Sequence, residues 1–160
     1  VLALLLAALH LWPEASLSWP SAPVEADAPR VVLVTANLLC SNPCHAELLQ
    51  ALREVRADAI ALQELTPPLR SFLEKGLTAY PHRAFAPEGT WADEAAGVAL
   101  FARSPLSEVR SLGIAVSYSP GLEATLDSPA GALRLRIVHL QRPGKPFRLE
   151  QRAQGLLHLE

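Results

Sequence analysis

Three polar residues stand at the ends of three apolar, strand-like segments: Asn37, Glu64 and His139. Asn37 ends VVLVTAN, Glu64 ends ADAIALQE, and His139 follows LRLRIV. Since alternate residues of a strand share a face, each of the three continues a row of apolar side chains that we expect to face the core. Open sheets of parallel strands bind ligands at the carboxyl ends of those strands, so we expect the three side chains to meet there.

These residue types suit one kind of chemistry. A buried carboxylate is costly unless it is paired or bound to a metal ion. The oxygens of Glu64 and Asn37 are hard donors, which suit Mg²⁺ or Mn²⁺ rather than zinc. A nearby imidazole, such as that of His139, could donate to a phosphate oxygen or pair with the carboxylate.

Each of the three residues also has a structural interpretation. An Asn that ends a strand is commonly a turn residue, and a Glu there is commonly a helix cap or a salt-bridge partner. A His at a strand end is more often a structural residue with its hydrogen bonds satisfied than a catalytic one. Their joint occurrence on core-facing rows is what favours the functional interpretation.

The first half of the chain predicts alternating strands and helices. Residues 31–37 are β-branched and apolar on both faces, which predicts a central strand. Asn42 and Pro43 then supply a helix N-cap and a proline at the first helical position. The strand at 57–64 follows after a short connection, and this order favours a parallel pair. Thr66 and the two prolines after it open a second helix.

The second half predicts strands. Residues 97–103 and 109–117 each read as a strand, and residues 121–140 read as a hairpin that turns near 128–131. A last helix is expected from about residue 147. No internal repeat is present.

Composition excludes some classes of protein. Half of the 160 residues are hydrophobic and 19% are charged, which argues against a disordered chain. The net charge of −2 is too neutral for a general nucleic-acid binder. Six basic residues against one acidic residue between Arg134 and Arg152 form either a solvated surface or a local field that favours phosphate. Cys40 and Cys44 are a weak zinc signal, since zinc needs four ligands; two free thiols and a local disulfide both remain open.

The N-terminus differs from the rest of the chain. Residues 1–12 form a hydrophobic segment that is too short to span a bilayer alone, and it is expected to be a transmembrane or signal-peptide remnant or a packed helix. Residues 13–29 are rich in proline and read as a semi-rigid linker. Residues 30–160 are expected to form the globular domain. We expect association with a membrane or export, and a monomer.

The segments TANLL, ADAIALQE, GVALFARSPL and LRIVHLQRP, in this order and spacing, resemble the endonuclease/exonuclease/phosphatase superfamily of DNase I-like enzymes. The hydrophobic N-terminus and the linker look most like its membrane-associated bacterial branch. The resemblance implies an α/β fold, a four-layer α/β/β/α sandwich with two mixed sheets, of which this chain would hold the N-terminal portion. It implies a metal-dependent phosphoester hydrolase that acts on nucleic acid, a phospholipid head group or a small phosphoester.

The resemblance also implies roles for the three residues. Glu64 would be the principal ligand of Mg²⁺ or Mn²⁺. Asn37 would lie beside the metal and the scissile phosphate, as a catalytic residue or a second ligand. His139 would contact the phosphate, and would stabilise the transition state or protonate the leaving group.

One departure from the family pattern puts catalysis in doubt. The later Asp-x-Asn and Asp-His motifs, which position the water and supply acid–base chemistry, do not occur in these residues. We therefore expect a partial domain whose parent protein is the enzyme. The alternative is a non-catalytic binding module of the same fold that recognises a phosphorylated ligand or a protein partner. A third interpretation is an unrelated α/β domain in which the three residues are structural.

Overall fold

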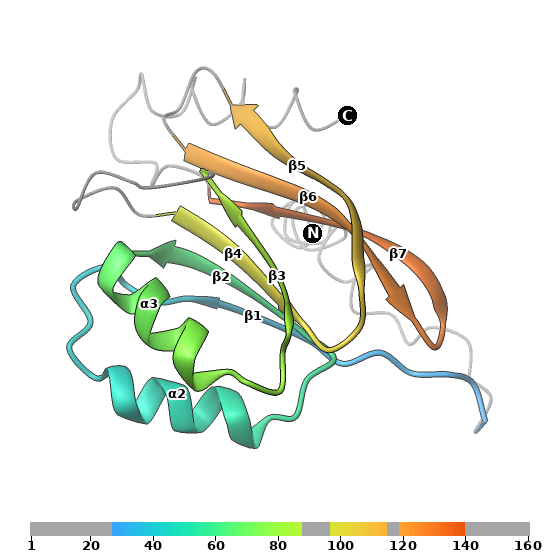
Figure 1. The fold of residues 1–160 in the computed structure, drawn as a ribbon, viewed down its shortest axis with the longest axis horizontal. Coiled ribbons are helices and arrows are strands. Elements are labelled where there is room, and N and C mark those ends of the chain that lie inside the picture. Colours follow the sequence, from blue (N-terminus) through green and yellow to red (C-terminus); the bar gives the residue numbers. More distant parts are fainter. Residues whose placement is uncertain (1–26, 88–96, 115–118, 140–160) are drawn as a thin grey trace, which may run out of the picture.

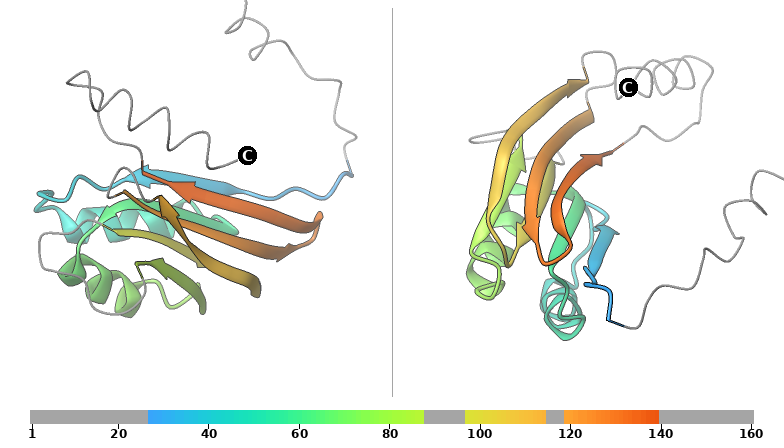
Figure 2. Two further views of the ribbon diagram at one scale, coloured as in Figure 1. Left: turned by 90° about the horizontal axis from the view of Figure 1, so that it is seen from above. Right: turned by 90° about the vertical axis from the view of Figure 1, so that its right-hand side faces the viewer.

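The computed structural model describes residues 27–87, 97–114 and 119–139, which form two stacked β-sheets and two helices (Figure 1). The first sheet has the order β1 (Leu33–Asn37), β2 (Ala59–Leu65), β4 (Gly97–Ala102) and β3 (His82–Ala86). The second sheet has the order β5 (Leu106–Ile114), β6 (Ser119–Ser128) and β7 (Gly131–Val138). The helices α2 (His45–Glu54) and α3 (Pro67–Gly76) cover the first sheet on its outer face (Figure 2).

Two apolar layers hold these elements together. Between the helices and the first sheet lie Ile60, Leu62, Leu65, Leu69 and Leu73, each at most 1% exposed. Between the two sheets lie side chains of β2, β4, β6 and β7: Ala59, Leu100, Leu122, Ala124, Leu126 and Ile137. All six residues of β4 are buried, because this strand has an apolar layer on each face. The described residues thus form α, β and β layers of the expected sandwich.

Several predicted features are confirmed. β1 and β2 are parallel, with Asn37 opposite Gln63 at the ends of the two strands. Thr66 is the N-cap of α3, and a proline follows it at the first helical position. β6 and β7 form the expected hairpin, with Ser128 paired with Gly131 across the turn. Gly131 has a φ of +99°, which a residue with a side chain rarely adopts.

Three details differ from the prediction. The first strand is not central: within the described residues, β1 is an edge strand, and its Leu33 is 49% exposed. The cap of α2 is Cys44, because the side chain of Asn42 accepts the Cys44 N–H at 2.9 Å and so closes the turn before the helix. The described sheet of β5, β6 and β7 is antiparallel throughout rather than mixed.

Some predictions concern segments outside the described residues. The hydrophobic segment 1–12, most of the linker 13–29 and the last helix from residue 147 belong to this group. Among the described helices, neither is long and apolar enough to cross a membrane. The predicted boundaries of the three regions of the chain therefore stay predictions.

Candidate active site

The backbone at Glu64 departs from the regular strand. On β4, Val98 pairs with Gln63 and Gly97 pairs with Leu65, so Glu64 is an extra residue in a β-bulge. Its φ of +57° is in the left-handed region, which costs about 1–2 kcal/mol in a residue with a side chain. Such local strain is common where a side chain has to be aimed at a functional site.

The bulge overturns one expectation about Glu64. A regular strand would place its side chain in the buried row of Ile60 and Leu62, but the next place in that row is taken by Leu65, which is 0% exposed. Because the bulge adds one residue, the Glu64 side chain leaves the core and remains 21% exposed. A carboxylate can therefore stand at the end of a buried strand without the full cost of burial.

Asn37 holds one oxygen of this carboxylate. Its Nδ2 donates to Glu64 Oε1 at 2.7 Å, and its Oδ1 accepts the backbone N–H of Leu39 at 3.0 Å. The side chain is exposed, as is Thr35 in the same row, so Asn37 does not continue a buried row as expected. The two hydrogen bonds hold the Asn37 amide in place and orient one oxygen of Glu64, and the role of Asn37 as a second ligand stays a prediction.

Cys40 holds the other oxygen. Its backbone N–H donates to Glu64 Oε2 at 3.1 Å. The chain turns directly after Leu38, with Leu39 at a φ of +55° and a hydrogen bond from the Asn42 N–H to the Leu39 carbonyl at 2.7 Å. The sequence analysis did not predict that Cys40 contacts Glu64. Cys40 follows Asn37 by three residues, and this closeness in sequence is the feature that indicates the contact.

His139 reaches the site from the second sheet. It directly follows β7, and its Nε2 lies 3.7 Å from Glu64 Oε1, within the range of an ion pair when the imidazole is protonated. Its side chain is 28% exposed. The structure therefore brings together Asn37, Glu64 and His139, the three residues that the sequence singled out. They lie where β1, β2 and β7 end.

The surroundings of Glu64 lower its pKa below the ordinary value of 4.5. The hydrogen bond from Asn37 has the largest effect; partial burial opposes it, and Cys40 and His139 lower the pKa further. Glu64 is therefore a carboxylate over the whole neutral range, which is the form that binds a cation.

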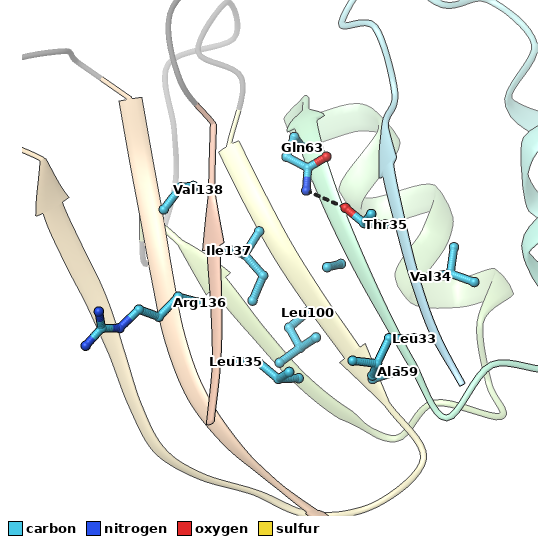
Figure 3. Close-up of a pocket in the computed structure, with 11 residues that line it drawn as sticks. Leu33, Val34, Thr35, Ala59, Gln63, Leu100, Leu135, Arg136, Ile137 and Val138 are labelled. Carbon is cyan, nitrogen blue, oxygen red and sulfur yellow. Dashed lines mark hydrogen bonds between the residues drawn. The ribbon is translucent and has the colours of Figure 1, made fainter. Parts of the chain in front are cut away.

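A groove of about 360 Å³ runs beside the site between the two sheets (Figure 3). Apolar side chains of β1, β4 and β7 line most of it, including Leu33, Leu100 and Leu135. Two of its polar lining residues bond each other: Gln63 Nε2 donates to Thr35 Oγ1 at 3.0 Å, as the dashed line in Figure 3 shows. This bond ties β1 to β2 just before Asn37 and Glu64.

Arg136 of β7 is engaged away from this site. Arg136 points away from the groove (Figure 3) and binds Glu123 on β6, with Nε 2.5 Å from Oε2. Arg110 on β5 binds the other oxygen of Glu123. The charge of Arg136 is therefore compensated on the outer face of the second sheet, which favours the interpretation of this part of the basic cluster as a structural surface.

The donor set is compatible with a hard divalent ion. Within the described residues, no group of three or more His, Cys, Asp and Glu side chains could hold a metal ion. Mg²⁺, however, commonly takes only one or two carboxylates and keeps several waters. Glu64, fixed through both of its oxygens and ionised, fits that mode of binding.

Comparison with known proteins identifies the family. The sequence model of the Endonuclease/Exonuclease/phosphatase family matches residues 34–160. The chain belongs to this family. A search of curated protein sequences finds no matching relative.

Solved structures of the same fold agree with this assignment. TDP2 from D. rerio, in a complex with single-strand DNA product, has 16% identity and a TM-score of 0.68, over 81% of this chain and 52% of that one. TDP2 from C. elegans has 15% identity and a TM-score of 0.69, over 96% and 49%. Sphingomyelinase C from Streptomyces griseocarneus has 11% identity and a TM-score of 0.62, over 79% and 56%. The family member described here thus spans about half the length of these structures and has the DNase I-like α/β sandwich fold.

Proposed function

We propose that the protein is part of a phosphoester hydrolase that uses Mg²⁺ or Mn²⁺ held at Glu64. The observation that supports this proposal is the fixation of one carboxylate by two donors, Asn37 Nδ2 and the Cys40 N–H, with His139 3.7 Å away. A carboxylate with a purely structural role needs no bulge that moves it out of the core. Family membership supplies the reaction class.

Each residue would have a distinct role. Glu64 would hold the cation, and Asn37 and Cys40 would keep the carboxylate oriented toward it. His139 would donate to a phosphate oxygen or to the leaving group, since its Nε2 faces the same carboxylate oxygen as Asn37. When bound, the cation would supply positive charge at the phosphate and an activated water.

The substrate class we favour is a phosphodiester. Two similar folds carry names that point to such bonds, single-strand DNA in one case and sphingomyelin in the other. Both are below 25% identity to this chain, so nucleic acid, a phospholipid head group and a small phosphoester remain candidate substrates.

The 160 residues alone are proposed to have little activity. The Asp-x-Asn and Asp-His motifs of the family do not occur in them, so the residues that would position the water must come from elsewhere in the parent protein. The second candidate function is a binding module of the same fold that holds a phosphorylated ligand or a protein partner without cleaving it, and the sequence that follows Glu160 in the parent protein distinguishes the two.

A location at or across a membrane is also proposed. It is supported by the composition of residues 1–12, which are apolar apart from His10. Separation of the membrane, periplasmic or extracellular, and soluble fractions of cells that express the parent protein tests it. Recovery in the soluble fraction alone would contradict it.

The hydrolase proposal is tested with bis(p-nitrophenyl) phosphate and the full-length parent protein. Glu64→Gln is expected to lower turnover at least ~100-fold, as removal of a group that stabilises the transition state commonly does. Glu54→Gln, at the far end of α2, is the control and should leave turnover unchanged. Equal turnover in both variants would contradict the proposal, and a wild-type parent that binds the compound without cleaving it would favour the binding module.

A further inference from the structure

Two thiols lie beside the candidate site and have no part in the chemistry proposed above. Cys40 and Cys44 are both exposed and both unpaired. They lie in the loop between β1 and α2, the same loop that reaches Glu64.

Cys40 influences the Glu64 carboxylate in two ways. Its backbone N–H donates to Glu64 Oε2 at 3.1 Å. Its thiol is the smallest of the influences that lower the pKa of Glu64. The backbone contact therefore links the position of residue 40 directly to the Glu64 carboxylate.

The side chain of Cys44 has no capping role. It is the N-cap of α2, but its side chain makes no capping hydrogen bond. Its backbone N–H is satisfied by Asn42 Oδ1 at 2.9 Å, so its sulfur can be modified without loss of the cap of the helix.

The loop is folded back between the two cysteines. The Leu39 carbonyl accepts the Asn42 N–H at 2.7 Å, and the Asn42 side chain closes a second turn onto Cys44. Five residues in extended form would separate the two Cα atoms by about 13 Å, and the two turns make the loop more compact than that. No strand pairing restrains residues 40–44.

We propose that Cys40 and Cys44 form a site of thiol–disulfide exchange that changes how Glu64 is held. One thiolate attacks a small disulfide such as oxidised glutathione, which releases one glutathione thiolate and leaves a mixed disulfide. The second cysteine then attacks the protein sulfur of that mixed disulfide, which forms the Cys40–Cys44 bond and releases the second glutathione. The protein loses two protons and two electrons, and the oxidised glutathione gains them.

Formation of the disulfide changes the contacts between Cys40 and Glu64. A disulfide sulfur carries no proton, so oxidised Cys40 cannot donate its S–H to Glu64. Closure of the bond also draws residue 40 toward residue 44 and strains the 3.1 Å contact of its N–H. The effect on metal affinity rests on the proposed function, whereas the effect on the contact with Glu64 does not.

The test uses the 160-residue chain in glutathione buffers of graded ratio. Mass spectrometry is expected to show loss of about two mass units and no retained glutathione. The ¹H–¹⁵N resonance of the Cys40 amide, recorded without metal, is expected to move on oxidation in the wild type. Cys44→Ala cannot close the Cys40–Cys44 bond, so it is expected to retain glutathione on Cys40 by mass. Stable mixed disulfides on both cysteines, or an unmoved Cys40 resonance in the oxidised wild type, would overturn the proposal.

Titration with Mn²⁺ distinguishes a failure of this proposal from a failure of the proposed function on which it rests. Oxidation is expected to weaken Mn²⁺ binding by about tenfold or more, as loss of a partner of a metal ligand commonly does. The double variant Cys40→Ala/Cys44→Ala has no thiol and should bind Mn²⁺ equally in both glutathione buffers. Equal affinity in both redox states would overturn the coupling to the metal. If neither state binds Mn²⁺, the proposed function fails, and the Cys40 resonance alone decides for or against the exchange site.

Discussion

Asn37 Nδ2 and Glu64 Oε1 are joined by a 2.7 Å hydrogen bond that links the ends of two parallel strands across 27 residues of sequence. The bond depends on two local features, the turn after β1 and the bulge in β2. It fixes a carboxylate at the place where β1, β2 and β7 end.

Asn37→Ala tests the orienting role of this bond. The variant loses the donor to Glu64 and the acceptor for the Leu39 N–H, so we expect Mn²⁺ affinity to fall by ~10–100-fold. Asn42→Ala is the control in the same loop, because the Asn42 side chain accepts the Cys44 N–H rather than contacting Glu64 in the described residues. Calorimetric titration measures both variants, and an equal affinity in the two would show that Asn37 has no special role.

The lowered pKa of Glu64 predicts a pH-dependent stability. Since the pKa is lower in the folded than in the unfolded chain, Glu64 stabilises the fold above the unfolded value, and this contribution is lost as the pH falls through the folded value. Urea unfolding of the wild type and Glu64→Gln in a pH series measures it. The difference between the two in free energy of unfolding should shrink toward acid pH, and a difference that grows there would contradict the assigned direction.

Glu123 on β6 is a second carboxylate with a lowered pKa, here because Arg136 and Arg110 bond it from the neighbouring strands. Its residue is 4% exposed. Glu123→Gln leaves two arginines without their carboxylate, so we expect a lower urea midpoint at neutral pH and a smaller loss of stability on acidification than in the wild type. Glu108→Gln, an exposed carboxylate on β5 that bonds Thr125, is the matched control and should change the midpoint less. The reverse order would contradict the cross-strand account.

Tyr80 has a buried hydroxyl whose removal is expected to stabilise the fold, in contrast to the paired carboxylate of Glu123. Its residue is 1% exposed, and its hydroxyl has no hydrogen-bond partner in the part of the chain that the structure describes. Tyr80→Phe keeps the ring under Arg103 and deletes the unsatisfied hydroxyl, so we expect the free energy of unfolding to rise by about 1 kcal/mol. Tyr80→Leu, which also loses the ring, should lower it. A clear loss of stability in Tyr80→Phe would show that the hydroxyl is bonded.

The sequence predicted that Asn37, Glu64 and His139 meet at the carboxyl edge of a parallel sheet. Asn37 and Glu64 lie at such an edge, but His139 reaches it from the second sheet, which is antiparallel in the described residues. The sequence was not sufficient to predict how Glu64 is presented. The bulge depends on the pairing of Leu65 with Gly97, a long-range relationship that alternation within β2 does not reveal. Apolar residues on both faces of β1 suggested a central strand, yet Leu33 lines the open groove between the sheets. Tertiary packing decided both features.

Calorimetric titration of Mn²⁺ into the wild-type chain, Glu64→Gln and Glu54→Gln tests whether Glu64 holds the metal ion. We expect one bound ion in the wild type and in Glu54→Gln, and an affinity at least ~10-fold weaker in Glu64→Gln. An affinity in Glu64→Gln equal to that of the wild type would contradict the claim that Glu64 is the metal ligand.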